Sequence, residues 1–183
     1  MLLIDVTPLK NVEFRRLYLS QFISAFGTQM TLVTIPFQVY KLTESTFHTG
    51  LVSLVELICL LATVFFGGVL ADNVDRRKIL VYSEWLMAAL VSVLAVNAYL
   101  ATPALSLIYV LAGVLSALSG LHRPSFEALT PLLVPKESLA QANALTALRQ
   151  TSSALLGPTV AGFLVASIGP FLTYGLDVLS FVV

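Results

Sequence analysis

The most informative stretch of this sequence is GGVLADNVDRRK, at residues 67–78, which lies between two long apolar segments. Five of its last seven residues carry a charge. Because charged side chains are costly in hydrocarbon, the chain must leave the bilayer here, turn within a few residues and re-enter. The pattern therefore predicts a tight hairpin between two membrane-spanning helices.

The overall composition is also that of a membrane protein. Hydrophobic residues make up 57% of the 183 residues and charged residues only 11%, against roughly 25% charged residues in a soluble domain. Lysine plus arginine equals aspartate plus glutamate, at ten each, so we expect no basic surface and no nucleic-acid partner. Cys59 is the only cysteine, which excludes an intrachain disulfide and a cysteine-based metal site.

Apolar length predicts the fold class. A membrane-spanning helix needs about 20 mostly apolar residues, and by that measure the sequence predicts an all-α, polytopic protein with six spans. The last span would rise only about 20 Å, short of the roughly 30 Å hydrocarbon core, so we expect the chain to be a fragment or a truncated gene product. The predicted spans lie near residues 17–40, 49–71, 79–100, 105–124, 141–167 and 170–183.

The basic residues outside these spans predict an orientation. Eight of them fall in the N-terminal segment and in the two connections on the same side, whereas only Lys41 falls on the opposite side. Positive charge accumulates in cytoplasmic loops, so the N-terminus is predicted to be cytoplasmic. The eight are Lys10, Arg15, Arg16, Arg76, Arg77, Lys78, Arg123 and Lys136.

Polar side chains form a stripe on the first and on the fifth predicted span. Such stripes should face a water-filled path or one another rather than lipid, and interhelical hydrogen bonding is the alternative. Two stripes in separate spans favour a cavity. The first consists of Gln21, Ser24, Thr28, Thr31 and Gln38, and the second of Asn143, Thr146, Arg149 or Gln150, and Ser153.

Three ionisable residues are predicted to lie within the membrane: Glu56, Arg149 and Asp177. Each costs about 2.5–3.5 kcal/mol to insert, which makes a functional role a candidate, more so for Glu56 and Arg149 than for Asp177. A carboxylate near the outer mouth could bind a proton, and Arg149 at greater depth could hold an anionic substrate. A structural ion pair between Arg149 and a carboxylate is the alternative. We expect Glu84, one turn into the third span, to extend back toward the cytoplasmic charges, and His122 to be structural.

The hairpin carries a resemblance to a known family. Residues 68–77, GVLADNVDRR, resemble the signature G-x-L-A-D-R-x-G-R-[RK] that lies between the second and third helices of the major facilitator superfamily. Asn73 and Asp75 depart from it, and an acidic residue followed by two basic ones is typical of the branch that contains siderophore exporters and macrolide-efflux-like proteins. The resemblance implies a six-helix N-terminal half built from two inverted three-helix repeats. It extends to Phe14-Arg15, to GPTVAG at residues 157–162 and to Gly169-Pro170.

The resemblance also implies a gate. In this superfamily the charges of the hairpin latch the two halves of the transporter during alternating access, which places Gly68, Asp72, Arg76 and Arg77 in the gating hairpin. The alternative is that the basic residues only set the orientation of the protein.

A second implied motif lies in the fifth span. Gly157, Pro158 and Gly162 resemble the exporter motif G-P-x-x-G-G. Proline removes a backbone donor and bends a helix, while small residues let a neighbouring helix approach. The motif would favour outward transport rather than bind substrate, and an ordinary kinked packing helix is the alternative.

Together these features predict a secondary exporter in the bacterial inner membrane, driven by the proton gradient. A siderophore such as enterobactin is the first candidate substrate, and a multidrug or macrolide-type compound is the second. The expected partners are the lipid bilayer, the small-molecule substrate and a C-terminal half that this sequence lacks. A non-transporting membrane component is the alternative from another class. No phosphate-binding loop, paired metal histidines or serine–histidine–acid set is found in the sequence, so we expect neither an enzyme nor a cofactor.

Overall fold

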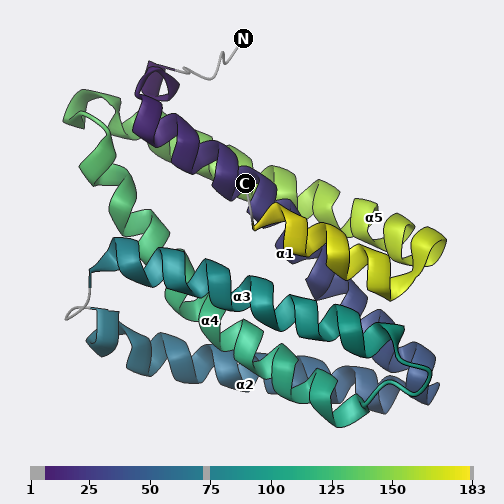
Figure 1. Cartoon of the computed structure of the whole chain (residues 1–183). Helices are drawn as coiled ribbons and strands as arrows, with labels where there is room; N and C mark the ends of the chain where they lie inside the picture. The colour runs from purple at the N-terminus through teal and green to yellow at the C-terminus, as the bar shows by residue number, and fades with distance from the viewer. Residues whose placement is uncertain (1–6, 72–74, 182–183) are drawn as a thin grey trace.

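The computed structural model describes residues 7–71 and 75–181 (Figure 1). Side chains at 66–71, 76, 123 and 128 lie outside this description. The described part is helical almost throughout, and the expected all-α class is confirmed. Its elements are η1 (Thr7–Lys10), α1 (Val12–Thr43), α2 (Thr46–Ala71), α3 (Arg76–Tyr99), α4 (Leu105–Leu133), η2 (Lys136–Ser138) and α5 (Leu139–Ser180).

Four helical segments of the described residues are long and apolar enough to cross a membrane: Thr46–Phe65, Arg77–Tyr99, Leu105–Leu133 and Lys136–Ser180. The helix α1 is not among them, although its 32 residues extend about 48 Å at 1.5 Å per residue. Its glutamine, serine and threonine residues lower its hydropathy, and several of these residues are buried. The count of six spans remains a prediction.

The last and longest helix is interrupted at Gly169, where φ is 82° and ψ is 169°. This left-handed conformation favours glycine, because a Cβ would clash there. The backbone around Pro158 keeps helical dihedral angles. The helix α5 therefore consists of two runs, residues 139–168 and 170–180, and the second turns back beside α1 (Figure 1).

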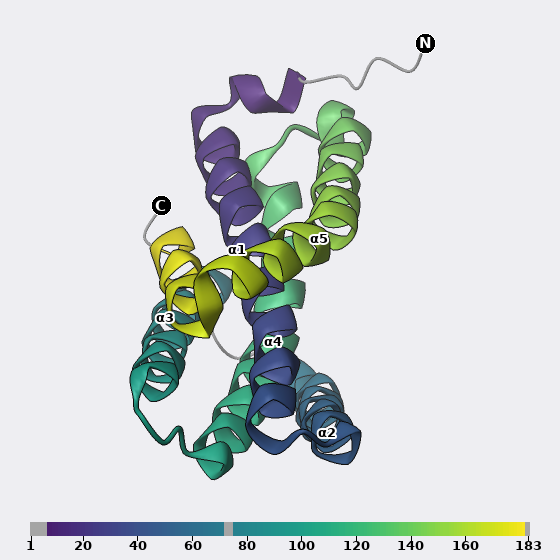
Figure 2. The ribbon, with the colours of Figure 1, turned by 90° about the vertical axis from the view of Figure 1, so that its right-hand side faces the viewer.

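Packing between the helices places α1 against α5 and α2 against α4, while α3 contacts both α4 and α5 (Figure 2). The larger buried cluster joins all five helices through residues such as Ile35, Val52, Leu94, Ile108 and Tyr174. A smaller cluster holds the start of α1 against the end of α4 and the start of α5. The bundle therefore has a continuous interior around which the polar residues are arranged.

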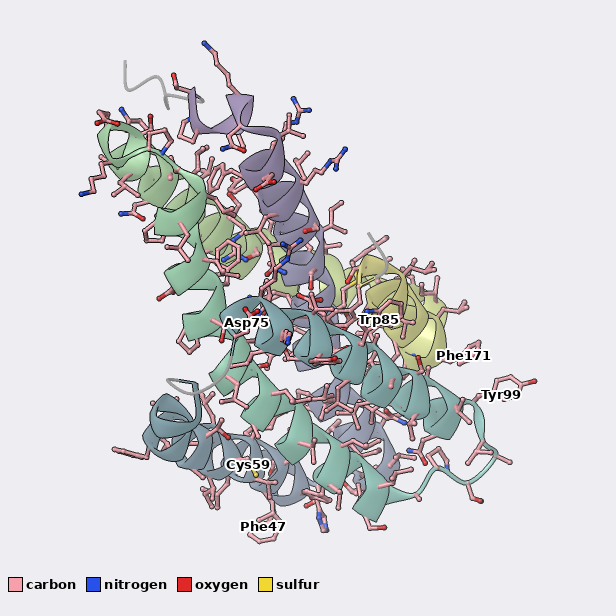
Figure 3. All side chains as sticks on the ribbon, turned by 60° about the vertical axis from the view of Figure 1, so that its left-hand side comes forward. Phe47, Cys59, Asp75, Trp85, Tyr99 and Phe171 are labelled. Carbon is pink, nitrogen blue, oxygen red and sulfur yellow. The ribbon has the colours of Figure 1, made fainter. Side chains whose placement is uncertain are left out.

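The outer faces of the helices are rich in exposed apolar side chains. On α2 these include Leu57, Ile58 and Leu61, and Figure 3 shows Phe47 and Tyr99 pointing away from the bundle. Large contiguous apolar surfaces are rare on soluble monomers. Such a surface suits contact with lipid.

The charged hairpin connects α2, which ends at Ala71, to α3, which begins at Arg76. Asp75 caps α3, because its side chain accepts a hydrogen bond of 3.0 Å from the backbone N–H of Arg77. Its φ of −57° is open to any residue, so the glycine of the superfamily signature is not required there. Asp72 lies outside the described residues, and the gating role of the hairpin remains a prediction.

Candidate substrate cavity

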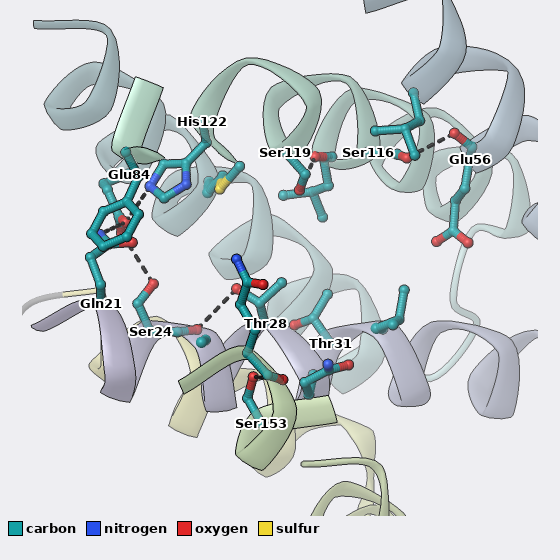
Figure 4. A pocket seen from close by; sticks show the side chains of 18 of the residues that line it. Gln21, Ser24, Thr28, Thr31, Glu56, Glu84, Ser116, Ser119, His122 and Ser153 are labelled. Carbon is teal, nitrogen blue, oxygen red and sulfur yellow. Dashed lines mark hydrogen bonds and ion pairs between the residues drawn. The ribbon is translucent and has the colours of Figure 1, made fainter. Parts of the chain in front are cut away.

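A cavity of about 380 Å³ lies between the five helices (Figure 4). Its size falls within the roughly 300–1,000 Å³ typical of small-molecule sites. Apolar side chains such as Ile35, Met87 and Phe126 form part of its wall. The polar and charged side chains that line it are Gln21, Ser24, Thr28, Gln29 and Thr31 of α1, Glu56 of α2, Glu84 of α3, Ser116, Ser119 and His122 of α4, and Arg149, Gln150 and Ser153 of α5.

Most of the polar stripe on α1 lines this cavity, but Gln38 does not. Gln38 is buried, and its Oε1 accepts a hydrogen bond of 2.9 Å from the hydroxyl of Tyr174 on the last run of α5. On α5 the cavity is lined by Arg149, Gln150 and Ser153. Helical periodicity predicts which residues share one face of a helix. It does not predict whether a given part of that face meets the cavity or another helix, because that depends on tertiary packing.

Glu84 does not extend toward the cytoplasmic charges, so that expectation was wrong. Its Oε1 lies 2.7 Å from Nε2 of His122 and accepts a 2.7 Å hydrogen bond from Nε2 of Gln21, while Oε2 accepts one of 3.3 Å from the hydroxyl of Ser24. A carboxylate with several nearby donors gains more by bonding to them than by extending away from them. Residues on α1, α3 and α4 thus meet at Glu84.

A signal for this cluster was present in the sequence. Glu84 follows the start of α3 closely, and His122 precedes the end of α4. In antiparallel neighbouring spans these positions fall at similar depth. A comparison of residue depths in neighbouring spans could therefore have paired Glu84 with His122. We expected only a structural role for His122, whereas its ionisable side chain lines the cavity.

Arg149 is held at the same end of the cavity. It is 8% exposed, its Nη1 donates a hydrogen bond of 3.4 Å to the main-chain carbonyl of Gln21, and its guanidinium carbon lies 4.4 Å from the centre of the Phe126 ring. This distance suits a cation–π interaction. Gln21 therefore contacts Arg149 through its main chain and Glu84 through its side chain.

Glu56 and Asp177 occupy different environments. Glu56 lines the cavity at the end away from Glu84 and His122 (Figure 4), and its carboxylate forms no hydrogen bond with the described residues. Asp177 is fully buried behind the cavity wall, where it accepts hydrogen bonds from the hydroxyls of Thr31 and Ser180. Of the three predicted intramembrane ionisable residues, the structure brings Glu56 and Arg149 to the cavity and leaves Asp177 outside it.

The glycines of the exporter-type motif differ in their surroundings. A Cβ built on Gly157 would lie 2.7 Å from the Cβ and Cγ atoms of Gln29, whereas one on Gly162 would meet nothing within 4 Å. Gly157 therefore permits the close approach of α5 to α1 beside the cavity.

These features define an integral membrane protein, a helical bundle that is apolar outside and contains a cavity lined by both apolar and polar side chains. Residues 4–183 match the family model described as a transmembrane secretion effector. The chain belongs to this family of the major facilitator superfamily.

Named relatives are enterobactin exporters. EntS of Salmonella paratyphi A is 33% identical over 175 residues, which cover 95% of this chain and 42% of that protein. EntS of Salmonella typhimurium has the same values, and EntS of Escherichia coli O1:K1 is 31% identical over the same lengths. The chain thus spans 42% of the length of these relatives. No solved structure matches it significantly.

Proposed function

We propose that this chain is the N-terminal half of a secondary exporter that moves an amphipathic small molecule out of the bacterial cytoplasm. The observation that carries the proposal is the cavity, which contains a nearly buried arginine within a bundle whose outer surface suits lipid. The names of the relatives point the same way. Transport would proceed by rocking of this half against a C-terminal half around the shared cavity.

The preferred substrate is a siderophore such as enterobactin. The guanidinium of Arg149 offers hydrogen-bond donors to carbonyl or phenolate oxygens, and the buried Phe126 ring beside it helps to hold it in place. This guanidinium favours a molecule that is rich in oxygen atoms.

A drug-like substrate with a protonated amine is the second candidate. One observation favours it: the carboxylate of Glu56 lines the cavity without a hydrogen bond to the described residues. An ammonium group would provide the opposite charge that an intramembrane carboxylate requires.

An export assay tests both candidates in the complete protein that contains this chain. In cells that lack their own siderophore exporter, Arg149→Ala should reduce enterobactin release by roughly 10- to 100-fold, because a hydrogen bond to a charged group contributes about 1.5–3 kcal/mol. Leu155→Ala, on the exposed face of α5, is the matched control. Glu56→Gln should impair only export of amine-bearing drugs. Normal enterobactin release by Arg149→Ala at wild-type membrane levels would refute the siderophore proposal.

The proposed orientation places the N-terminus and the α2–α3 hairpin in the cytoplasm of an inner-membrane protein. It rests on the distribution of basic residues. A cysteine at Asp75 should react with a membrane-impermeant maleimide only after the cells are opened, whereas one at Ala101, in the α3–α4 connection, should react in intact cells. The reverse labelling pattern would invert the topology.

In this orientation Gly68, Asp72, Arg76 and Arg77 would form the cytoplasmic latch. Replacement of Asp72 or Arg77 by alanine should then reduce export while leaving membrane insertion intact. Unchanged export in both variants would remove the hairpin from the mechanism.

A further inference from the structure

The cluster around Glu84 brings a carboxylate and an imidazole on different helices together at the wall of the cavity. Glu84 of α3 and Nε2 of His122 on α4 lie 2.7 Å apart, and both side chains are 16% exposed. Both also line the cavity. The pair is therefore shielded from lipid but accessible to a molecule in the cavity.

Among the side chains that the structure describes, few charged ones surround this pair. Gln21 and Ser24, the residues of α1 that bind Glu84, are neutral. The helix α5 contributes Arg149, on the other side of Gln21, and the fully buried Asp177. Glu56 of α2 lies at the far end of the cavity (Figure 4).

The net charge of the pair depends on one proton. With neutral His122 the pair carries one negative charge, and with protonated His122 it carries none. Charges interact strongly where the effective dielectric constant is low, so this change alters what the cavity can bind.

We infer that the Glu84–His122 pair is the proton-binding site that couples the proton gradient to substrate export, an inference that rests on the function proposed above. With the Nε2–H of His122 donating to Oε1 of Glu84, one proton adds to the lone pair on Nδ1 and forms an imidazolium–carboxylate pair. Release of the same proton restores the neutral imidazole. No other bond forms or breaks.

Protonation of the pair and binding of substrate in the cavity oppose one another. The unprotonated pair gives the cavity wall one negative charge, which favours a substrate with hydroxyl or ammonium donors, and protonation neutralises that charge. By linkage, substrate binding must promote proton release to the same extent. Gln21 extends the effect to Arg149, because it contacts both groups. A transporter that exchanges a proton for a substrate requires that binding of one weakens binding of the other.

The other acidic residues of the interior fit this role less well. Asp177 is fully buried and does not line the cavity. Glu56 lines it, but no basic side chain among the described residues lies within ion-pairing distance of its carboxylate. Glu84 is the acidic residue that combines access to the cavity with a basic partner.

The test uses the complete protein in proteoliposomes with enterobactin as the probe. Glu84→Gln keeps the shape of the side chain and an acceptor for Gln21 but cannot ionise, and His122→Gln tests the partner. Each variant should lose gradient-driven accumulation by about tenfold or more, while exchange of enterobactin without a gradient stays near the wild-type rate. Leu155→Ala, on the exposed face of α5, is the matched control and should retain both activities. Glu56→Gln is assayed in parallel to compare the other acidic residue that lines the cavity.

The outcomes separate the two proposals. Absence of any enterobactin transport by the wild type would refute the proposed function. Wild-type transport together with gradient-driven accumulation by Glu84→Gln would overturn only the proton site. Loss of exchange as well as accumulation in both pair variants would make the pair a binding or structural element and would also overturn it. Selective loss of accumulation in Glu56→Gln would transfer the role to Glu56.

Discussion

Substitution of Gly27 by alanine should destabilise the contact between α1 and the last run of α5. A Cβ at this position would collide with Oγ of Ser180 and Oδ1 of Asp177, and would lie 2.7 Å from Cβ of Ser180. To make room for the methyl group, both Ser180 and Asp177 would have to move, and Asp177 is held in place by the hydrogen bond that it accepts from Thr31.

The cost can be estimated from three contributions. Overpacking of a close contact costs about 1–3 kcal/mol, and displacement of Ser180 weakens a hydrogen bond that contributes about 0.6 kcal/mol in membranes. The higher helix propensity of alanine offsets about 0.5–1 kcal/mol of this loss. A net loss of roughly 1–3 kcal/mol remains, which corresponds to a fall in Tm of about 1–3 °C for a complete protein as long as the relatives.

The measurement is the thermal unfolding of the complete protein in detergent. Gly175→Ala is the matched control, because it lies on the same run of α5 and its Cβ would meet nothing within 4 Å. Its Tm should remain unchanged or rise slightly. Adding Ser180→Gly to Gly27→Ala should recover part of the loss, with a coupling energy of about 0.5 kcal/mol or more. A Gly27→Ala protein as stable as the wild type would refute the close approach of α1 and α5.

Four further substitutions test local contacts through Tm. Gly157→Ala should cost about 1–3 kcal/mol through overpacking, and Gly162→Ala should cost less, so equal losses would contradict the packing of α5 on α1. Tyr174→Phe, which removes the hydrogen bond to Gln38, should cost only about 0.6 kcal/mol, and a loss several times larger would give that bond a greater role. Asn11→Ala removes the N-cap of α1 and should cost about 1 kcal/mol. An unchanged Tm would argue against that cap.

The helical class could be predicted because lipid imposes a simple rule: an apolar stretch of about 20 residues must satisfy its own backbone hydrogen bonds. The interruption at Gly169 falls at a Gly-Pro pair, because glycine allows a positive φ and proline has no backbone N–H to continue the helix. The stripe from Gln21 to Thr31 was predictable because a helix repeats every 3.6 residues. These inferences need only local sequence.

The partners of these side chains could not be derived in the same way. Gln21 and Gln38 share a helical stripe, but one lines the cavity and the other binds Tyr174, because α5 turns back beside only part of α1. The bond between Glu84 and His122 depends on α3 and α4 being neighbours. Hydrophobic length and periodicity carry no information about which helices are adjacent.

The reversal of α5 at Gly169 has a consequence for probing the protein from outside the bilayer. Because two helical runs meet at a single non-helical residue, this corner exposes almost no extended peptide. Proteases and antibodies need several residues of accessible chain, so an epitope tag would have to be inserted at this corner before either reagent could detect it.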